Sequence, residues 1–237
     1  MAFVHKRRNA NTRRRALLRR GVAGCARGPA ALAGGYGAAL LLKKQPPAAL
    51  GWAALAAAVL CALAARRMTV RAAILTSGLS GERRAVAALR SLPNEYQILA
   101  NPVLSARGQT AELDAAVIGR NGIFLVEAKN HSGVIAGKAD AEWWSQKKRS
   151  GAKRMKNPLL QVERQRRVVQ SALEDASLSC PVCEMVYFAN PNARVGVRDP
   201  RIFTDADALR RAILNTPRPK TLVDPARVLA ALERTCW

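Results

Sequence analysis

The chain has 237 residues, with 39 lysine and arginine residues against 16 aspartate and glutamate residues, for a formal net charge of +23. Its apolar content of 49% is enough for the core of one ordinary domain with an appendage. The five cysteines are odd in number and scattered, which excludes a disulfide framework and favours a reducing compartment. A large positive charge favours polyanionic partners, either nucleic acid or anionic lipid.

Charge is distributed unevenly along the chain. All 16 acidic residues lie at or after Glu82, whereas residues 5–71 contain 14 basic residues and no acid. Residues 72–237 contain 25 basic and 16 acidic residues, a difference of +9. A block of like charge repels itself and stays disordered until it meets an anionic surface. We therefore expect residues 1–27 to form a basic segment of this kind.

Two apolar stretches between residues 28 and 71 predict a membrane anchor. The first, 28–42, is short and rich in glycine, while the second, 48–65, has 18 uncharged residues, close to the ~20 that cross a bilayer. The sequence KKQPP between them predicts a tight turn. An alanine-rich soluble helix is the alternative for the second stretch.

The basic residues around these stretches predict the orientation of the anchor. Basic residues before residue 28 and after residue 65 favour a transmembrane hairpin with both ends in the cytoplasm. We therefore expect contact with membrane lipid and a location at the cytoplasmic membrane, with the rest of the chain facing the cytoplasm. A single span would instead export that part.

Residues 72–190 have the pattern of a mixed domain, which residues 191–237 extend with helices. The expected elements, in chain order, are a helix at 80–92, strands at 96–104, 111–119 and 122–130, short strands at 133–137 and 141–146, a basic loop at 147–156, a helix at 158–173, a strand at 184–190 and helices at 207–214 and 224–234. This order predicts an α/β fold in which helices flank a mixed sheet.

Polar residues interrupt two of the expected strands. The apolar run 122–126 indicates a strand buried on both faces. Glu127 and Lys129 follow this run at a spacing of two, so both side chains point to one side. Asp114 lies in the preceding strand, and strands this close in sequence usually pair. Two neighbouring carboxylates repel each other unless they share a cation such as Mg²⁺. An exposed ion pair at a strand end is the alternative explanation for Glu127 and Lys129.

An ordered series of motifs resembles the NERD domain, the nuclease-related domain of the PD-(D/E)xK superfamily. The motifs are GE at 81–82, ELDAAVIGRNGIFLVEAKNHSGVI at 112–135, a tryptophan at 143 or 144, and NPLLQ at 157–161. The resemblance covers roughly residues 78–190 and implies a restriction-endonuclease-like fold. It also implies a nuclease that uses Mg²⁺ or Mn²⁺ to hydrolyse phosphodiester bonds.

The same resemblance implies roles for individual residues. Asp114 and Glu127 would bind the metal, with the Ala128 carbonyl as a further ligand, and Lys129 would be the catalytic lysine. Glu82 would be an accessory acid, although an acid in the first turn of a helix is favourable in any case. Gln161 would contact metal or substrate, with a solvated helix residue as the alternative. Many family members carry a histidine where this chain has Ala115, so any help from that side chain is missing here.

Six basic residues in the segment 147–156 are candidates for binding nucleic acid. They are Lys147, Lys148, Arg149, Lys153, Arg154 and Lys156. Beside a phosphodiesterase site they would hold the nucleic-acid backbone without reading its sequence; otherwise they form a solvated loop. Trp143 and Trp144 fit packing better than base stacking.

Together these observations predict a membrane-tethered, metal-dependent nuclease that acts on nucleic acid, with DNA as the expected form. Two alternatives remain. One is a membrane-anchored module of the same fold that binds nucleic acid or protein without turnover. The other is an enzyme like a Holliday-junction resolvase, which would require a homodimer.

Overall fold

The computed structural model describes residues 1–6, 17–18, 20–22, 48–220 and 224–236. The chain divides into two compact units. The first unit consists of Met1–Asn9 together with Ser80–Trp237, and the second consists of Ala10–Leu79.

The main element of the second unit is helix α2 (Ala48–Leu89), whose last residues, from Ser80 onward, belong to the first unit. The stretch 48–65, which we expected to span a membrane, lies in this helix. The helix does not end at residue 65 but continues past the charged residues Arg66, Arg67 and Arg71. Within the described ranges, no helix has both the length and the hydropathy of a membrane span, so the expected transmembrane hairpin is not found there. The other stretch, 28–42, lies outside the described residues.

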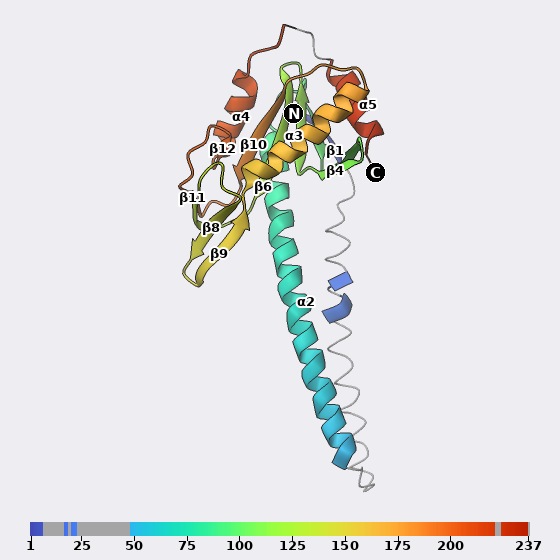
Figure 1. The fold of residues 1–237 in the computed structure, drawn as a ribbon, viewed down its shortest axis with the longest axis vertical. Coiled ribbons are helices and arrows are strands. Elements are labelled where there is room, and N and C mark those ends of the chain that lie inside the picture. Colours follow the sequence, from blue (N-terminus) through green and yellow to red (C-terminus); the bar gives the residue numbers. More distant parts are fainter. Residues whose placement is uncertain (7–16, 19, 23–47, 221–223, 237) are drawn as a thin grey trace. The chain divides into compact units, whose positions relative to one another are not determined.

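A six-stranded sheet forms the centre of the first unit (Figure 1). Its strands, in spatial order, are β1 (Phe3–Lys6), β2 (Gln97–Ala100), β5 (Ala115–Gly119), β6 (Gly122–Lys129), β10 (Val182–Phe188) and β12 (Ile202–Phe203). Strand β2 is parallel to β1 and antiparallel to β5, while β6 is antiparallel to β5 and parallel to β10. The predicted mixed sheet is therefore confirmed.

Strand β1 is a feature that the sequence analysis did not predict. Residues 3–6 begin the basic N-terminal segment, yet they pair in parallel with β2, with Val4 opposite Ile98. The Ala2 side chain is buried in the same cluster as Ile98. The start of the chain thus belongs to the folded domain.

Helices cover both faces of the sheet and close two hydrophobic clusters. On one face, α3 (Pro158–Asp175) and α5 (Pro225–Arg234) pack with Ile123 and Leu125 of β6. On the other face, the end of α2 and helix α4 (Ala206–Asn215) pack with Phe124 and Val126. The apolar residues of β6 therefore alternate between two buried faces, as their sequence predicted.

Two smaller sheets differ from the expected elements. The predicted strand 96–104 is broken at Asn101, which has a φ of 55°, so that β3 (Val103–Ala106) pairs instead with β4 (Gln109–Glu112). The predicted basic loop is a β-hairpin, formed by β8 (Trp143–Lys148) and β9 (Gly151–Lys156). This hairpin continues a sheet with β7 (Gly133–Ala136) and β11 (Ala193–Val195).

Candidate active site

The two acids of the candidate site lie where β5 begins and β6 ends. Ala115 pairs with Val126, so the next position of the antiparallel ladder places Asp114 opposite Glu127. The Ala128 backbone N–H donates a hydrogen bond of 2.7 Å to Asp114 Oδ2. The strand pairing thus brings together the two carboxylates that are separate in the sequence.

Glu127 and Lys129 form an ion pair that is shielded from solvent. Lys129 Nζ lies 2.6 Å from Glu127 Oε1, and the two side chains are 17% and 3% exposed. A buried carboxylate is costly unless it is paired and hydrogen-bonded. The alternative of a solvent-exposed ion pair at a strand end is therefore wrong for these two residues.

Helix α3 places an amide beside this lysine. The Asn157 side chain caps the helix by accepting from the Leu159 N–H at 2.9 Å, and Pro158 occupies the first turn. One turn on, Gln161 Oε1 accepts a hydrogen bond of 2.9 Å from Lys129 Nζ. The NPLLQ sequence thus starts the helix and directs its glutamine to Lys129.

Gln165 is a member of the site that the sequence analysis missed. Its Nε2 donates to Glu127 Oε2 at 2.7 Å and to the Glu112 carbonyl at 3.0 Å. It follows Gln161 by four residues, a spacing that places both side chains on one face of the helix. This spacing of four is the feature of the sequence that could have indicated a role for Gln165. The Glu127 carboxylate is therefore held by Lys129 on one oxygen and by Gln165 on the other.

Glu82 reaches the neighbourhood of the site through a close contact between α2 and the end of β6. A Cβ at Gly81 would lie 2.8 Å from the Asn130 Cβ, so only glycine permits this approach. Asn130 Nδ2 donates to Ser80 Oγ at 2.7 Å, and Arg84 donates to Asn130 Oδ1 at 3.0 Å. Burial is the main cause of the raised pKa of Asp114, and the charge of Glu82 is a minor one.

The electrostatics at Asp114 favour a cation. Its pKa is well above the ordinary value, first because burial disfavours the charged form and next because of the Glu127 carboxylate. The N–H of Ala128 and the ammonium of Lys129 act in the opposite direction. A divalent ion shared by the two acids would remove the repulsion between them.

The donor set at this position fits magnesium or manganese. Within the described residues, no group of three His, Cys, Asp or Glu side chains surrounds a common point. Mg²⁺ does not require one, since it usually binds one or two carboxylates and keeps several waters. In a strand the N–H and C=O of one residue point to the same side, so the Ala128 carbonyl faces the same side as the N–H that Asp114 accepts. Asp114, Glu127 and this carbonyl are the groups that would hold the ion.

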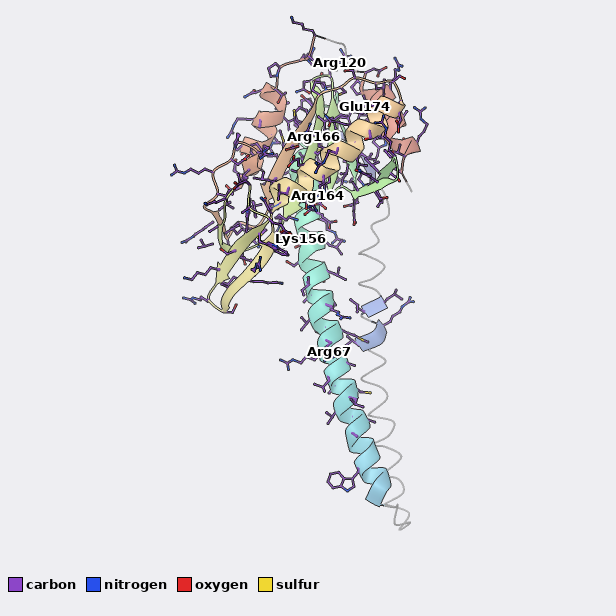
Figure 2. The ribbon with its side chains drawn as sticks, viewed as in Figure 1. Arg67, Arg120, Lys156, Arg164, Arg166 and Glu174 are labelled. Atoms are coloured by element: carbon purple, nitrogen blue, oxygen red, sulfur yellow. The ribbon has the colours of Figure 1, made fainter. Side chains whose placement is uncertain are left out.

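The six basic candidates all lie exposed on the β8–β9 hairpin or its turn. The pairing of Gln146 with Lys153 and of Lys148 with Gly151 places Lys148 and Lys153 on one face. Both lysines contribute to the lowered pKa of His131, so this face lies near the site. Lys147, Arg154 and Lys156 share the other face. Lys156 also lines a pocket of about 260 Å³ with Gln161 and Arg164 of α3. Figure 2 labels Lys156 at the end of β9 and Arg164 on α3.

The two tryptophans of the hairpin differ in their environment. Trp144 is 1% exposed, and its Nε1 donates to the Lys138 carbonyl at 2.8 Å, which agrees with the expected packing role. Trp143 is 38% exposed, and the Arg154 guanidinium lies 4.7 Å from its ring centre. Trp143 therefore presents an aromatic surface to solvent, contrary to the packing role expected for it.

Cys180 and Cys183 have the properties of unreactive thiols. Burial raises the pKa of the Cys180 thiol to about 11 and also raises the pKa of Cys183. A redox cysteine needs a lowered pKa. These cysteines fit the structural role of small residues at the start of β10.

Replacing Gln165 by leucine should destabilise the fold at the candidate site. We expect the free energy of unfolding to fall by about 1–3 kcal/mol, because Glu127 Oε2 would remain buried without its donor. Urea titration measures this change. The Gln109→Leu variant is the control, since Gln109 is exposed on β4, and it should behave like the wild type. Equal stability of all three proteins would contradict the role given to Gln165.

His131 should make the fold sensitive to acid. Its pKa is lowered from 6.5 to about 4, first by burial and then by the charges of Lys129, Lys148 and Lys153. Its Nδ1 is buried without a hydrogen-bond partner in the described part of the chain. Between these two pH values the unfolded chain binds a proton that the folded chain excludes, so stability falls as the pH is lowered from 6.5 to about 4. The His131→Asn variant should lose less stability in urea titrations over this range, and an equal loss would contradict the assignment.

The comparison with known families agrees with this arrangement. Residues 77–189 match the family model NERD, described as nuclease-related domain. The chain is also 38% identical over 71 residues to an uncharacterized protein of Bacillus anthracis, a match that covers 29% of this chain and 34% of that protein. The chain therefore spans about a third of the length of this curated relative. No solved structure matches the chain. Residues 77–189 of this chain are therefore similar to the nuclease-related domain of the NERD family.

Proposed function

We propose that this protein is a metal-dependent nuclease whose active site consists of Asp114, Glu127 and Lys129. The observation that carries the proposal is the position of the Lys129 ammonium, which Glu127 and Gln161 hold beside the Asp114 carboxylate. Two acids and a lysine at adjoining strand ends are groups that can assemble a metal, a water and a phosphodiester. The match to a nuclease-related domain supports the same activity.

Each residue has a distinct part in the proposed reaction. A bound Mg²⁺ or Mn²⁺ would supply Lewis-acid activation of the phosphate and a water of lowered pKa. Asp114 and Glu127 provide the negative charge that holds the ion. Lys129 orients the attacking water and stabilises the negative charge that develops on the phosphate. Gln161 and Gln165 keep the lysine and Glu127 in place. Glu82 acts as an accessory acid beside Asp114.

The substrate in this proposal is nucleic acid, with DNA as the first choice. The basic residues of the β8–β9 hairpin would contact phosphates on both sides of the hairpin, which gives affinity without sequence preference. In this proposal the basic hairpin binds the nucleic acid that the restriction-endonuclease-like site cleaves. The same contacts would make binding weaken steeply with salt.

A nuclease assay of the full chain tests the proposal. Single-stranded DNA, duplex DNA, a four-way junction and RNA are incubated with Mg²⁺, with Mn²⁺ and with EDTA. Cleavage that requires a divalent ion supports the proposal. Binding without cleavage of any substrate supports the non-catalytic module instead. Selective junction cleavage by a dimer, with the mass measured by light scattering, supports the resolvase-like alternative.

We also propose that the protein is attached to the cytoplasmic membrane and that its nuclease domain faces the cytoplasm. The proposal rests on the sequence, which combines a basic start with the uncharged run 48–65 and three following arginines. Cell fractionation followed by high-salt and alkaline washes tests the attachment. A reporter fused after Arg71 tests the orientation, and export of this reporter would contradict it.

A further inference from the structure

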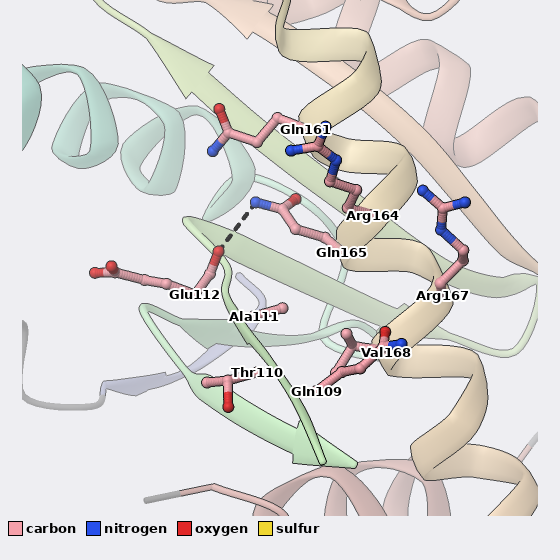
Figure 3. Close-up of a pocket in the computed structure, with 9 residues that line it drawn as sticks. All are labelled: Gln109, Thr110, Ala111, Glu112, Gln161, Arg164, Gln165, Arg167 and Val168. Carbon is pink, nitrogen blue, oxygen red and sulfur yellow. Dashed lines mark hydrogen bonds between the residues drawn. The ribbon is translucent and has the colours of Figure 1, made fainter. Parts of the chain in front are cut away.

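A groove of about 720 Å³ lies beside the candidate site, between helix α3 and strand β4 (Figure 3). Gln165 connects the two, because it binds Glu127 of the site and the Glu112 carbonyl at the edge of the groove. Gln161, which contacts the catalytic lysine, also lines the groove. The groove therefore opens directly onto the position where the proposed reaction takes place.

Two arginines of α3 line this groove at increasing distance from Gln161 along the helix. Arg164 and Arg167 are exposed, and their spacing of three places them side by side on one helix face. Within the described residues, neither side chain has an ion pair or a hydrogen bond. Arg166, between them, is instead bound to Glu184 at 2.7 Å. The groove thus has two available positive charges, while the neighbouring arginine serves the fold.

The lining of the groove favours a sugar–phosphate backbone over bases. None of its nine lining residues is aromatic, so it offers no ring on which a base can stack. Arginine forms bidentate hydrogen bonds with phosphate. The Glu112 carboxylate, the one acidic side chain of the lining, points away from α3 in Figure 3. The side chains that line the groove therefore suit the binding of a sugar–phosphate backbone.

The size of the groove favours one strand. Cavities of roughly 300–1,000 Å³ hold small-molecule ligands, and a nucleotide unit is a ligand of this size. Lys156 lines a smaller pocket that shares Gln161 and Arg164 with the groove. A strand can therefore pass from the β8–β9 hairpin, across Lys129 and Gln161, into the groove.

We propose that the groove between α3 and β4 binds the single strand of nucleic acid that continues from the scissile phosphate, with Arg164 and Arg167 contacting successive phosphates. This inference rests on the proposed function, because it takes the scissile phosphate to lie at Lys129. It adds a binding surface separate from the basic hairpin. A substrate with a single-stranded flank would use both surfaces.

The test measures binding by fluorescence anisotropy with a labelled oligothymidylate and with a blunt duplex of equal length. All proteins are full chains that carry Lys129→Gln, so that the probes stay intact. Arg164→Gln with Arg167→Gln is compared with Arg211→Gln, an exposed helical arginine on α4 outside the groove. Thermal unfolding verifies that each variant is folded.

We expect the double variant to lower the salt slope of single-strand binding by about 1.4, since each phosphate contact on a single strand contributes about 0.7. Arg211→Gln should leave the slope unchanged, and duplex binding should be equal in all proteins. A slope equal to that of Arg211→Gln would overturn the proposal, and an equal loss on the duplex would overturn the preference for a single strand. The test measures binding, so its result remains valid even if the wild type cleaves no substrate. Absence of cleavage would contradict the proposed function but not the binding of a strand in the groove.

Discussion

Replacing Lys129 by alanine should reduce cleavage by at least about 100-fold, the low end of what a group acting on the nucleophile contributes. The reason is that its ammonium acts mainly in the transition state, so the rate falls while substrate affinity changes little. The basic hairpin still supplies the salt-dependent contacts in the variant. Single-turnover cleavage and anisotropy, in the same magnesium buffer, measure the two effects.

Two further variants separate this effect from loss of structure. Lys129 compensates the buried Glu127, and breaking a buried pair costs about 3–5 kcal/mol, so Lys129→Ala also destabilises the fold. The Lys129→Gln variant keeps an amide donor for Glu127 and removes the charge. Lys147→Ala, on the exposed hairpin, should weaken binding and leave the rate of the bound complex unchanged. Equal cleavage by the wild type and both Lys129 variants would contradict the catalytic role proposed for Lys129.

Metal binding should depend on Asp114 and Glu127 together. Each substitution removes one of the two anionic ligands, so Asp114→Asn and Glu127→Gln should each weaken Mg²⁺ binding measured by calorimetry and abolish cleavage. Glu82→Gln should have a smaller effect. Glu112→Gln is the matched control, because its exposed carboxylate is on β4 close to Asp114 in sequence. Unchanged Mg²⁺ affinity in both site variants would place the metal elsewhere.

A second test of the interaction between Asp114 and Glu127 needs neither metal nor substrate. In Glu127→Gln, the pKa of Asp114 should fall toward its ordinary value, since one of the causes that raise it is removed. It should remain above that value, because burial is the larger cause. Titration of the carboxyl carbon by NMR follows this change. An unaltered pKa would mean that the two acids do not interact.

Local patterns predicted the centre of this domain well. The apolar run of β6 indicated a strand buried on both faces, and the antiparallel pairing with β5 followed from the short connection between them. These two inferences were enough to bring Asp114 to Glu127 and Lys129. The helix signal at Asn157 and Pro158 was equally local, because a cap and a proline define a helix start within a few residues.

The elements that were missed depend on contacts whose local signature is weak or absent. Strand β9 has one buried residue, Met155, among exposed lysines and arginines, so its alternation was too weak to distinguish it from a loop. Gln165 acquires its role only when α3 lies across the sheet and faces Glu127. For the same reason the groove with Arg164 and Arg167 was not predictable, since β3 and β4 form a separate hairpin after the break at Asn101.

The pairing of β1 with β2 has a consequence for how the chain folds. Its two partners, Phe3–Lys6 and Gln97–Ala100, enclose the whole segment Ala10–Leu79 as a loop. Closing a long loop costs little additional stability, but long-range contacts of this kind form slowly. Strand β1 is therefore expected to dock last. Until then β2 is an open edge strand that other chains can join, so aggregation during refolding should begin at this edge.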